Sequence, residues 1–182
     1  KEGVYIQTGE ASEVELNYEN GTILRIGEKS ILKISKSQMQ KESDQTEILL
    51  EKGILFFKVT KLSGDDSHFI MSTPTSTAAI RGTEGSIESS GTNSLAWLKE
   101  GKLELTHSVS GEKLLINDLE RAVQDETGFE LEKFKNMETL LSSLPVAREK
   151  MNKFIKLHQD KVEKIVGEKS VNAFDELEEQ FK

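Results

Sequence analysis

The sequence is a cysteine-free, acidic chain of 182 residues, in which 24 basic and 32 acidic side chains give a formal net charge of −8. The lack of cysteine excludes a disulfide framework, a thiolate zinc site and a cysteine nucleophile. No apolar run reaches the roughly 18 residues that a membrane-spanning helix needs. The negative charge argues against a protein that binds the phosphate backbone of nucleic acids.

The N-terminus begins within a strand-like pattern. The chain opens at Lys1 without an initiator Met. We therefore expect a processed product, so that any signal peptide, lipid anchor or transmembrane segment would lie upstream of Lys1.

The distribution of glycine divides the chain in two. Twelve of the 13 glycines lie between Gly3 and Gly128, and only Gly167 lies beyond them. Glycine is frequent where short strands alternate with tight turns, and it is costly inside helices. The sequence therefore predicts a β-domain over residues 1–125 and a helical segment over residues 126–182.

The first predicted strands form a hairpin. Residues 12–16 alternate polar and apolar side chains with period two, which is typical of a half-buried strand, and residues 22–26 return beside them. Asn20-Gly21 joins the two runs. This dipeptide suits a two-residue type I′ turn, because both central residues of that turn need φ > 0.

Short strands continue to about residue 123. They cover residues 30–34, 46–50, 54–60, 68–72, 77–81, 85–89, 94–99, 102–106, 113–116 and 121–123. We expect a polar loop over residues 35–45, a turn at Lys52-Gly53 and a hairpin turn at Glu100-Gly101. About ten short strands with turns every 8–12 residues are typical of an antiparallel β-sandwich or jelly roll.

The pattern changes to a helical period after the predicted β-domain. A short helix is predicted over residues 131–141, and Leu144-Pro145 fits the start of a longer one that ends at Gly167. A last helix is predicted from Ser170 to Phe181. The longer helix has an apolar stripe at heptad spacing, made of Met151, Ile155, His158, Val162 and Ile165. We expect this segment to pack on the sandwich or to form a small helical hairpin.

Several motifs resemble the FecR domain family and occur in the family's order. Residues 72–84 contain Thr73-Pro74 and Arg81-Gly82-Thr83-Glu84, which are similar to the family's Thr-Pro and Arg-Gly-Thr hallmark. Further motifs that resemble those of the family are Thr8-Gly9, Asn20-Gly21-Thr22, Lys52-Gly53-Ile54 and Glu100-Gly101-Lys102. The resemblance covers roughly residues 4–123. Gly85 departs from the family pattern, which usually has Phe at this position.

The resemblance implies an extracytoplasmic β-sandwich. The best-known family members are periplasmic regulators that relay the state of an outer-membrane receptor to a sigma factor, and others are envelope or secreted modules. The predicted helical tail differs from the small α/β domain with which the regulators contact a receptor. We therefore first expect a non-enzymatic binding or signalling module of a bacterial envelope protein, which is periplasmic, secreted or anchored as a lipoprotein. Its partner would be an envelope protein or a cell-wall glycan.

Two alternatives remain open for the function. The first is a periplasmic sigma-factor regulator in metal or nutrient uptake signalling. The second is a structural scaffold that forms homo-oligomers through its helical tail.

The motif residues have a structural and a functional interpretation. In the structural interpretation, which we favour, the motif residues stabilise the fold; they are Thr73, Pro74, Arg81, Gly82, Thr83 and Gly101. Pro74 would end a strand, Gly82 would allow a backbone conformation that a Cβ forbids, and the five donors of Arg81 could satisfy carbonyl groups at a sheet corner. In the functional interpretation, Arg81 and Thr83 bind a ligand.

Trp97 is the third candidate ligand-binding residue. It is the only tryptophan, and strand alternation places it on one face with Leu95, while Ala96 and Leu98 lie on the other. Both faces are apolar, which predicts a central strand or one covered by the helical tail. Packing is the simpler role for Trp97. The alternative is an aromatic platform for a sugar or a peptide.

No catalytic residue, metal site or cofactor is predicted. His68, His107 and His158 lack the spacing of metal ligands, and no Gly-x-Ser-x-Gly nucleophile elbow occurs. The acidic loop over residues 64–67 lacks the alternating oxygen ligands of a calcium-binding EF-hand. We therefore expect that the protein is not an enzyme and does not bind nucleic acid.

Overall fold

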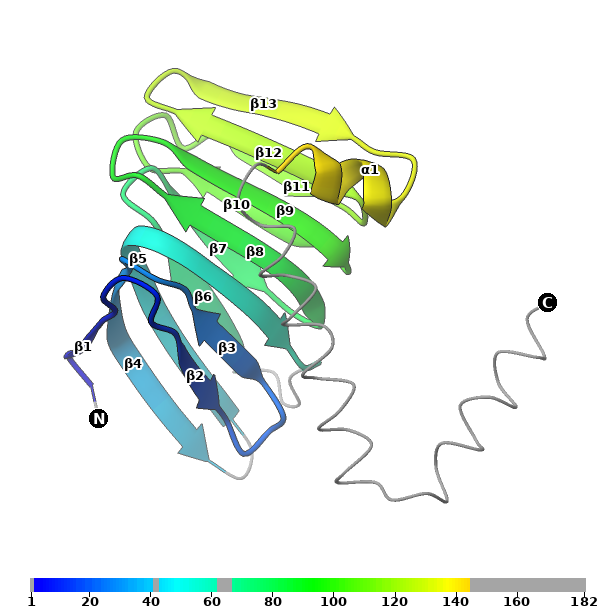
Figure 1. The fold of residues 1–182 in the computed structure, drawn as a ribbon. Helices are drawn as coiled ribbons and strands as arrows, with labels where there is room; N and C mark the ends of the chain where they lie inside the picture. Colours follow the sequence, from blue (N-terminus) through cyan, green and yellow to red (C-terminus); the bar gives the residue numbers. More distant parts are fainter. Residues whose placement is uncertain (1, 41–42, 62–66, 145–182) are drawn as a thin grey trace. The chain divides into compact units, whose positions relative to one another are not determined.

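The structure is a computed structural model that describes residues 2–40, 43–61 and 67–144. The chain forms two compact units, residues 1–140 and residues 141–182. The described helix is α1 (Met137–Ser142), and no described helix is long and apolar enough to cross a membrane. The described strands are β1 (Val4–Gln7), β2 (Val14–Asn17), β3 (Ile23–Ile26), β4 (Ile31–Gln40), β5 (Ser43–Val59), β6 (His68–Ser72), β7 (Ser76–Ile80), β8 (Thr83–Ser89), β9 (Ser94–Glu100), β10 (Leu103–His107), β11 (Lys113–Ile116), β12 (Glu120–Asp125) and β13 (Gly128–Lys133) (Figure 1).

The strands form two layers that are joined through β5 (Figure 1). Sheet A consists of β1, β4, the first part of β5, β6, β7, β10 and β11. Sheet B consists of β2, β3, the last part of β5, β8, β9, β12 and β13. All neighbouring strands are antiparallel except β5 and β6, which are parallel. The prediction of a mainly β sandwich is confirmed.

β5 passes from sheet A to sheet B at Gly53. Up to Lys52 it pairs with β4, and from Gly53 to Val59 it pairs with β8. Gly53 has φ +103°, and a Cβ at this position would lie 2.5 Å from the Cα of Ser30. The predicted turn at Lys52-Gly53 is therefore wrong. Glycine here allows a close backbone contact within one continuous strand of 17 residues.

The Glu100-Gly101 segment is also a passage between the sheets. The predicted hairpin at this position is wrong, because β9 pairs with β8 and β12 in sheet B, whereas β10 pairs with β7 and β11 in sheet A. Gly101 does adopt positive φ (+99°), as a hairpin glycine often would. A glycine between two apolar runs therefore indicates a change of direction but does not indicate which strands pair.

The predicted polar loop over residues 35–45 is mostly strand. β4 continues to Gln40 and β5 begins at Ser43, and these two residues are paired. Ser35 and Gln38 are exposed, so this end of the ribbon lacks a buried face. Because backbone pairing extends beyond the core, the side chains show no period-two pattern there.

The Asn20-Gly21 hairpin is present, but its loop differs from the predicted type I′ turn. The backbone N–H of Tyr18 donates to the carbonyl of Thr22 at 2.9 Å, which leaves three residues in the loop. Gly21 has φ +83°, whereas Asn20 does not have positive φ. The Asn20 side chain instead accepts a hydrogen bond from the Thr22 N–H at 2.9 Å.

The predicted helix over residues 131–141 is wrong in its first part. Residues 128–133 form β13, whose Phe129 and Leu131 alternate with glutamates, as expected for a strand. α1 begins later, after Asn136, whose side chain accepts the backbone N–H of Thr139 at 2.9 Å. The other predicted helices lie outside the described residues, and the domain boundary at residue 125 stays a prediction.

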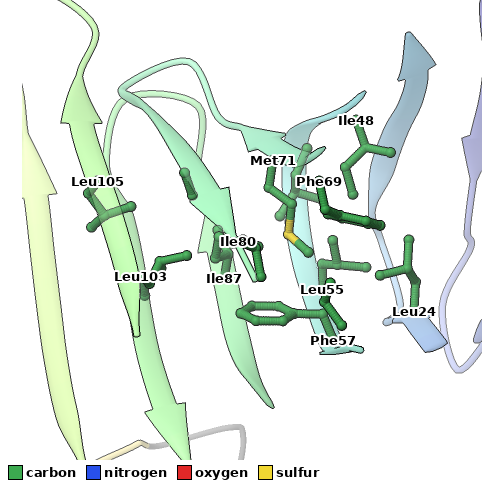
Figure 2. Close-up of a cluster of buried hydrophobic side chains, with 14 of the residues drawn as sticks. Leu24, Ile48, Leu55, Phe57, Phe69, Met71, Ile80, Ile87, Leu103 and Leu105 are labelled. Atoms are coloured by element: carbon green, nitrogen blue, oxygen red, sulfur yellow. The ribbon is translucent and has the colours of Figure 1, made fainter. Parts of the chain in front are cut away.

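The hydrophobic core lies between the two sheets. β5 contributes to it on both sides of its bend, with Ile48 and Leu50 from sheet A and Leu55 and Phe57 from sheet B. Figure 2 shows Ile48, Leu55 and Phe57 of β5 beside side chains of other strands, such as Met71. A single strand therefore supplies both layers of the core.

We expect Gly53→Ala to destabilise the protein more than Gly91→Ala. The φ angles are similar (+103° and +97°), so both changes place a Cβ in the left-handed region at a cost of about 1–2 kcal/mol. Only the Gly53 change also forces a steric clash, with Ser30, which adds roughly 1–3 kcal/mol, whereas nothing lies within 4 Å of a Cβ on Gly91. Urea denaturation measures both free energies of unfolding, and equal losses would contradict the proposed crossing constraint.

Candidate functional site

The Thr-Pro and Arg-Gly-Thr motifs lie at opposite ends of β7. Thr73 and Pro74 precede the strand, and Arg81, Gly82 and Thr83 follow it. Five extended residues separate the two motifs by roughly 17 Å. The two halves of the hallmark therefore do not form one site.

Thr73 belongs to a buried polar cluster that connects the two sheets. Its hydroxyl accepts the backbone N–H of Ser76 at 3.1 Å, and its own N–H donates to the Ser76 carbonyl at 2.7 Å. Gln124 of β12 donates to the Thr75 hydroxyl at 2.8 Å, and Ser94 of β9 lies beside both Thr73 and Thr75. The first motif thus fixes the β6–β7 turn to sheet B, while Pro74 is exposed.

The Arg-Gly-Thr motif forms a corner where β7 of sheet A leads into β8 of sheet B. The buried Thr83 hydroxyl lies 2.9 Å from the Lys102 carbonyl and 3.2 Å from the Arg81 carbonyl, to which it donates. A Cβ on Gly101 would lie 2.6 Å from the carbonyl oxygen of Gly82. Two passages between the sheets therefore pack closely at this corner, and the Arg81 side chain is exposed.

A third polar corner surrounds the bend of β5. The Thr8 hydroxyl donates to the Gly27 carbonyl at 2.6 Å and accepts the Ser30 N–H at 2.9 Å. The Ser30 hydroxyl in turn accepts the Ile54 N–H at 3.1 Å. Thr8 belongs to a motif that resembles the FecR family. The sequence did not predict a role for Ser30, because a serine after a turn has no distinctive spacing from other polar residues.

A fourth corner, which the sequence did not predict, joins β11 to β12. The buried Glu120 carboxylate accepts the backbone N–H of Asn117 at 2.9 Å and pairs with Lys133 at 2.6 Å. Burial alone would raise the pKa of Glu120, but the hydrogen bonds from Lys133 and Asn117 and the charge of Lys133 lower it overall. The carboxylate form therefore stabilises this corner.

The outer face of sheet B carries one continuous row of paired side chains, which we call the Trp97 row. It consists of Glu15, Arg25, Phe56, Ser86, Trp97, Arg121 and Glu132. Ion pairs lie at both ends, with 3.0 Å between Glu15 and Arg25 and 2.5 Å between Arg121 and Glu132. Arg121 also lies over the ring of Phe134, 5.3 Å from its centroid.

The centre of the Trp97 row is buried although it points away from the core. Trp97 and Ser86 are 0% exposed and Phe56 is 1% exposed. Their neighbours along the strands, such as Leu98 and Ile87, lie in the core on the opposite face. The Trp97 Nε1–H and the Ser86 hydroxyl have no hydrogen-bond partner among the described residues.

The three candidate ligand-binding residues are not brought together. Thr83 is buried on the core side, Arg81 is exposed at a corner, and Trp97 is buried on the outer face of sheet B. These contacts support the structural interpretation of the motifs. Ligand binding through Arg81, Thr83 or Trp97 stays a prediction.

The two described histidines have separate roles in the fold. His68 Nε2 lies 3.4 Å from the Glu47 carboxylate on the outer face of sheet A. His107 is buried, and its Nδ1 accepts the Ser110 N–H at 3.1 Å, so its Nε2 carries the proton that is donated to the Asp125 carbonyl at 2.7 Å. Within residues 2–40, 43–61 and 67–144, no group of three or more His, Asp or Glu side chains could hold a metal ion. His158 lies outside the described residues.

Comparison with protein families identifies the sandwich. The family described as FecR protein matches residues 4–104, which is more than half of the chain. The match extends from β1 into β10 and includes the corners at Thr8, Gly53 and Thr83. No curated protein sequence matches the chain significantly.

Two solved structures share the fold. Both are crystal structures of a proposed anti-sigma factor from Parabacteroides distasonis ATCC 8503, at 1.65 and 2.50 Å resolution, with TM-scores of 0.57 and 0.58 and sequence identities of 14% and 15%. Each alignment covers 73% of this chain and 60% of the solved chain. The chain therefore spans about 60% of the length of these proteins, and at this identity the likeness concerns the fold alone.

We expect Thr83→Val to destabilise the protein by about 1–3 kcal/mol, because it removes the buried hydroxyl that donates to the Lys102 carbonyl. Thr77→Val is the matched control, since Thr77 is exposed on β7, and its change should stay within about 0.5 kcal/mol. Chemical denaturation compares the two variants. A Thr83→Val protein as stable as the control would show that the corner does not depend on this hydroxyl.

We expect Glu120→Gln to lower stability at neutral pH by roughly 1.5–3 kcal/mol, because charge-assisted hydrogen bonds to Asn117 and Lys133 are weakened. Since folding lowers the pKa of Glu120, its contribution is complete above the ordinary value of 4.5 and is lost as the pH falls through the lower folded-state pKa. The wild type and the variant should therefore converge in acid. Denaturation at several pH values measures this difference, with the exposed Glu130→Gln as the control, and a gap that persists in acid would contradict the assignment.

Proposed function

The chain belongs to the FecR family, and on that premise we propose that it is a non-enzymatic, extracytoplasmic signalling module of a bacterial envelope protein. The family match over residues 4–104 carries this proposal. The fold shared with a proposed anti-sigma factor agrees with a regulatory role. The module transmits a signal by contact with another protein.

The positions of the motif residues support a role of the sandwich as a rigid scaffold. Thr8, Gly53, Thr73 and Thr83 fix turns and passages between strands, so the family's motifs serve the geometry of the sandwich. Because these contacts fix the connections between the two sheets, the sheet faces and loops keep constant positions relative to one another. Such surfaces suit protein recognition, in which affinity depends on a rigid, complementary patch.

Within this proposal, we favour a periplasmic regulator of a sigma factor in metal or nutrient uptake. The two structural neighbours are described as a proposed anti-sigma factor, and they share the sandwich. The partner would be an envelope protein of the same signalling pathway. Recognition of a cell-wall glycan is less favoured, because a stacking platform needs an exposed ring and Trp97 is 0% exposed.

The proposal predicts the compartment of residues 1–182 and the effect of the gene on transcription. Alkaline phosphatase fused directly after residue 182 in the gene product should be active in the source bacterium, and β-galactosidase at the same position should be inactive. Deletion of the codons for residues 4–104 should change transcripts that share one class of sigma-factor promoter, and the intact gene should restore them.

Each outcome of this experiment is decisive. An active β-galactosidase fusion would place the module in the cytoplasm and refute the extracytoplasmic assignment. A correctly exported protein whose deletion leaves every transcript unchanged would refute regulation of a sigma factor.

A further inference from the structure

β1 is an edge strand of sheet A, and it exposes apolar side chains (Figure 1). Its sequence is Val4-Tyr5-Ile6-Gln7, and it pairs with β4 on one side. Val4 is 39% exposed and Tyr5 is 56% exposed. An edge strand of this kind is a template for pairing with a further strand, because its outer backbone groups and apolar side chains remain in contact with water.

The register of β1 and β4 determines which backbone groups point away from the sheet. The Thr8 N–H donates to the Ser30 carbonyl at 3.0 Å, and these two residues are opposite each other when the register is continued by one residue. Hydrogen-bonded and non-hydrogen-bonded pairs alternate along an antiparallel ladder. The N–H and C=O groups of Tyr5 and Gln7 are therefore directed away from β4, where they can form hydrogen bonds with an added strand.

The other edge strands of the two sheets carry charged side chains. Glu15 lies on β2, Lys113 lies on β11, and Glu130 and Glu132 lie on β13. Charged side chains on an edge strand hinder its pairing with another chain. β1 has no charged residue, so among the edges of the described sheets it is the one without this protection.

The surroundings of β1 are acidic. Residues 2–20, which contain β1 and β2, have five glutamates and no lysine or arginine. Arg25 and Lys29 pair with two of these glutamates, and the Lys33 Nζ lies 5.6 Å from the centroid of the Tyr5 ring. Five anions against three cations leave a surplus of two negative charges. This edge therefore attracts a basic segment, whereas it repels a second copy of itself.

We propose that β1 is the docking site for an extended, basic segment of a partner protein, which adds to sheet A as a further strand. Side chains of such a strand alternate between the two faces of the sheet. Apolar residues at every second position would extend the core beside Val4 and Ile6, and the basic residues between them would face water. This inference rests on the proposed function in one respect, namely that the occupant belongs to a protein.

A synthetic peptide tests this site on the full chain. The probe is a peptide of about ten residues in which valine and lysine alternate, and in the matched peptide each lysine is replaced by glutamate. The valine–lysine peptide should bind and slow the hydrogen exchange of the Tyr5 and Gln7 amides severalfold, while the exchange of the β13 amides stays unchanged. The valine–glutamate peptide should bind about tenfold more weakly, because the edge is acidic.

The variant Tyr5→Pro tests the addition of a strand directly. Proline removes the outward N–H of this residue, and an edge strand tolerates proline where the N–H faces solvent. Tyr5→Thr is the matched control, because it removes the ring and keeps the N–H. Affinity for the valine–lysine peptide should fall about tenfold further in the proline variant than in the control. Far-UV circular dichroism checks the fold, and Gln7→Pro replaces Tyr5→Pro if that variant unfolds.

Four outcomes would overturn the proposal. The first is a valine–lysine peptide that does not bind or leaves the Tyr5 and Gln7 amides unprotected. The second is equal binding of the acidic peptide, and the third is a folded proline variant that binds as tightly as its control. The fourth is protection of these amides that rises with protein concentration alone, because a second copy would then occupy the edge. All are measured on the purified chain, so they are independent of the export and transcription tests of the proposed function.

Discussion

The close contact between Gly53 and Ser30 is the constraint on which the sandwich depends. It lets β5 leave sheet A and enter sheet B without interrupting its backbone pairing. The same strand then supplies core side chains to both layers, from Ile48 to Val59. A side chain at position 53 would force either the strand or the neighbouring turn to move, and with it the spacing of the two sheets.

Other passages between the sheets are stabilised in similar ways. A glycine lets two backbone segments approach closely, or a buried polar side chain forms hydrogen bonds with backbone carbonyl and N–H groups. Gly101 and Thr83 lie together where β7 leads into β8 and β9 leads into β10. Glu120 accepts a backbone hydrogen bond where β11 leads into β12. Backbone groups at such corners leave the sheet ladder and must find other partners. Several FecR-like motifs thus mark points where the chain changes sheet, which explains why they are dispersed along the sequence.

The outer face of sheet B shows where this scaffold can meet another layer. Its ends are held by ion pairs, and its centre is an aromatic and aliphatic stripe.

The sequence by itself determined the β character of the chain, most strand positions and an apolar pattern on both faces of the Trp97 strand, because alternation with period two reports burial directly. The family motifs also followed from the sequence. Only the tertiary structure decided that Gly53 and Gly101 lie at passages between sheets, that residues 128–133 form an edge strand, and that Ser30 and Glu120 hold corners. A glycine between apolar runs is compatible with a hairpin, a bend or a crossing, and the choice depends on which distant strand offers a partner for the backbone.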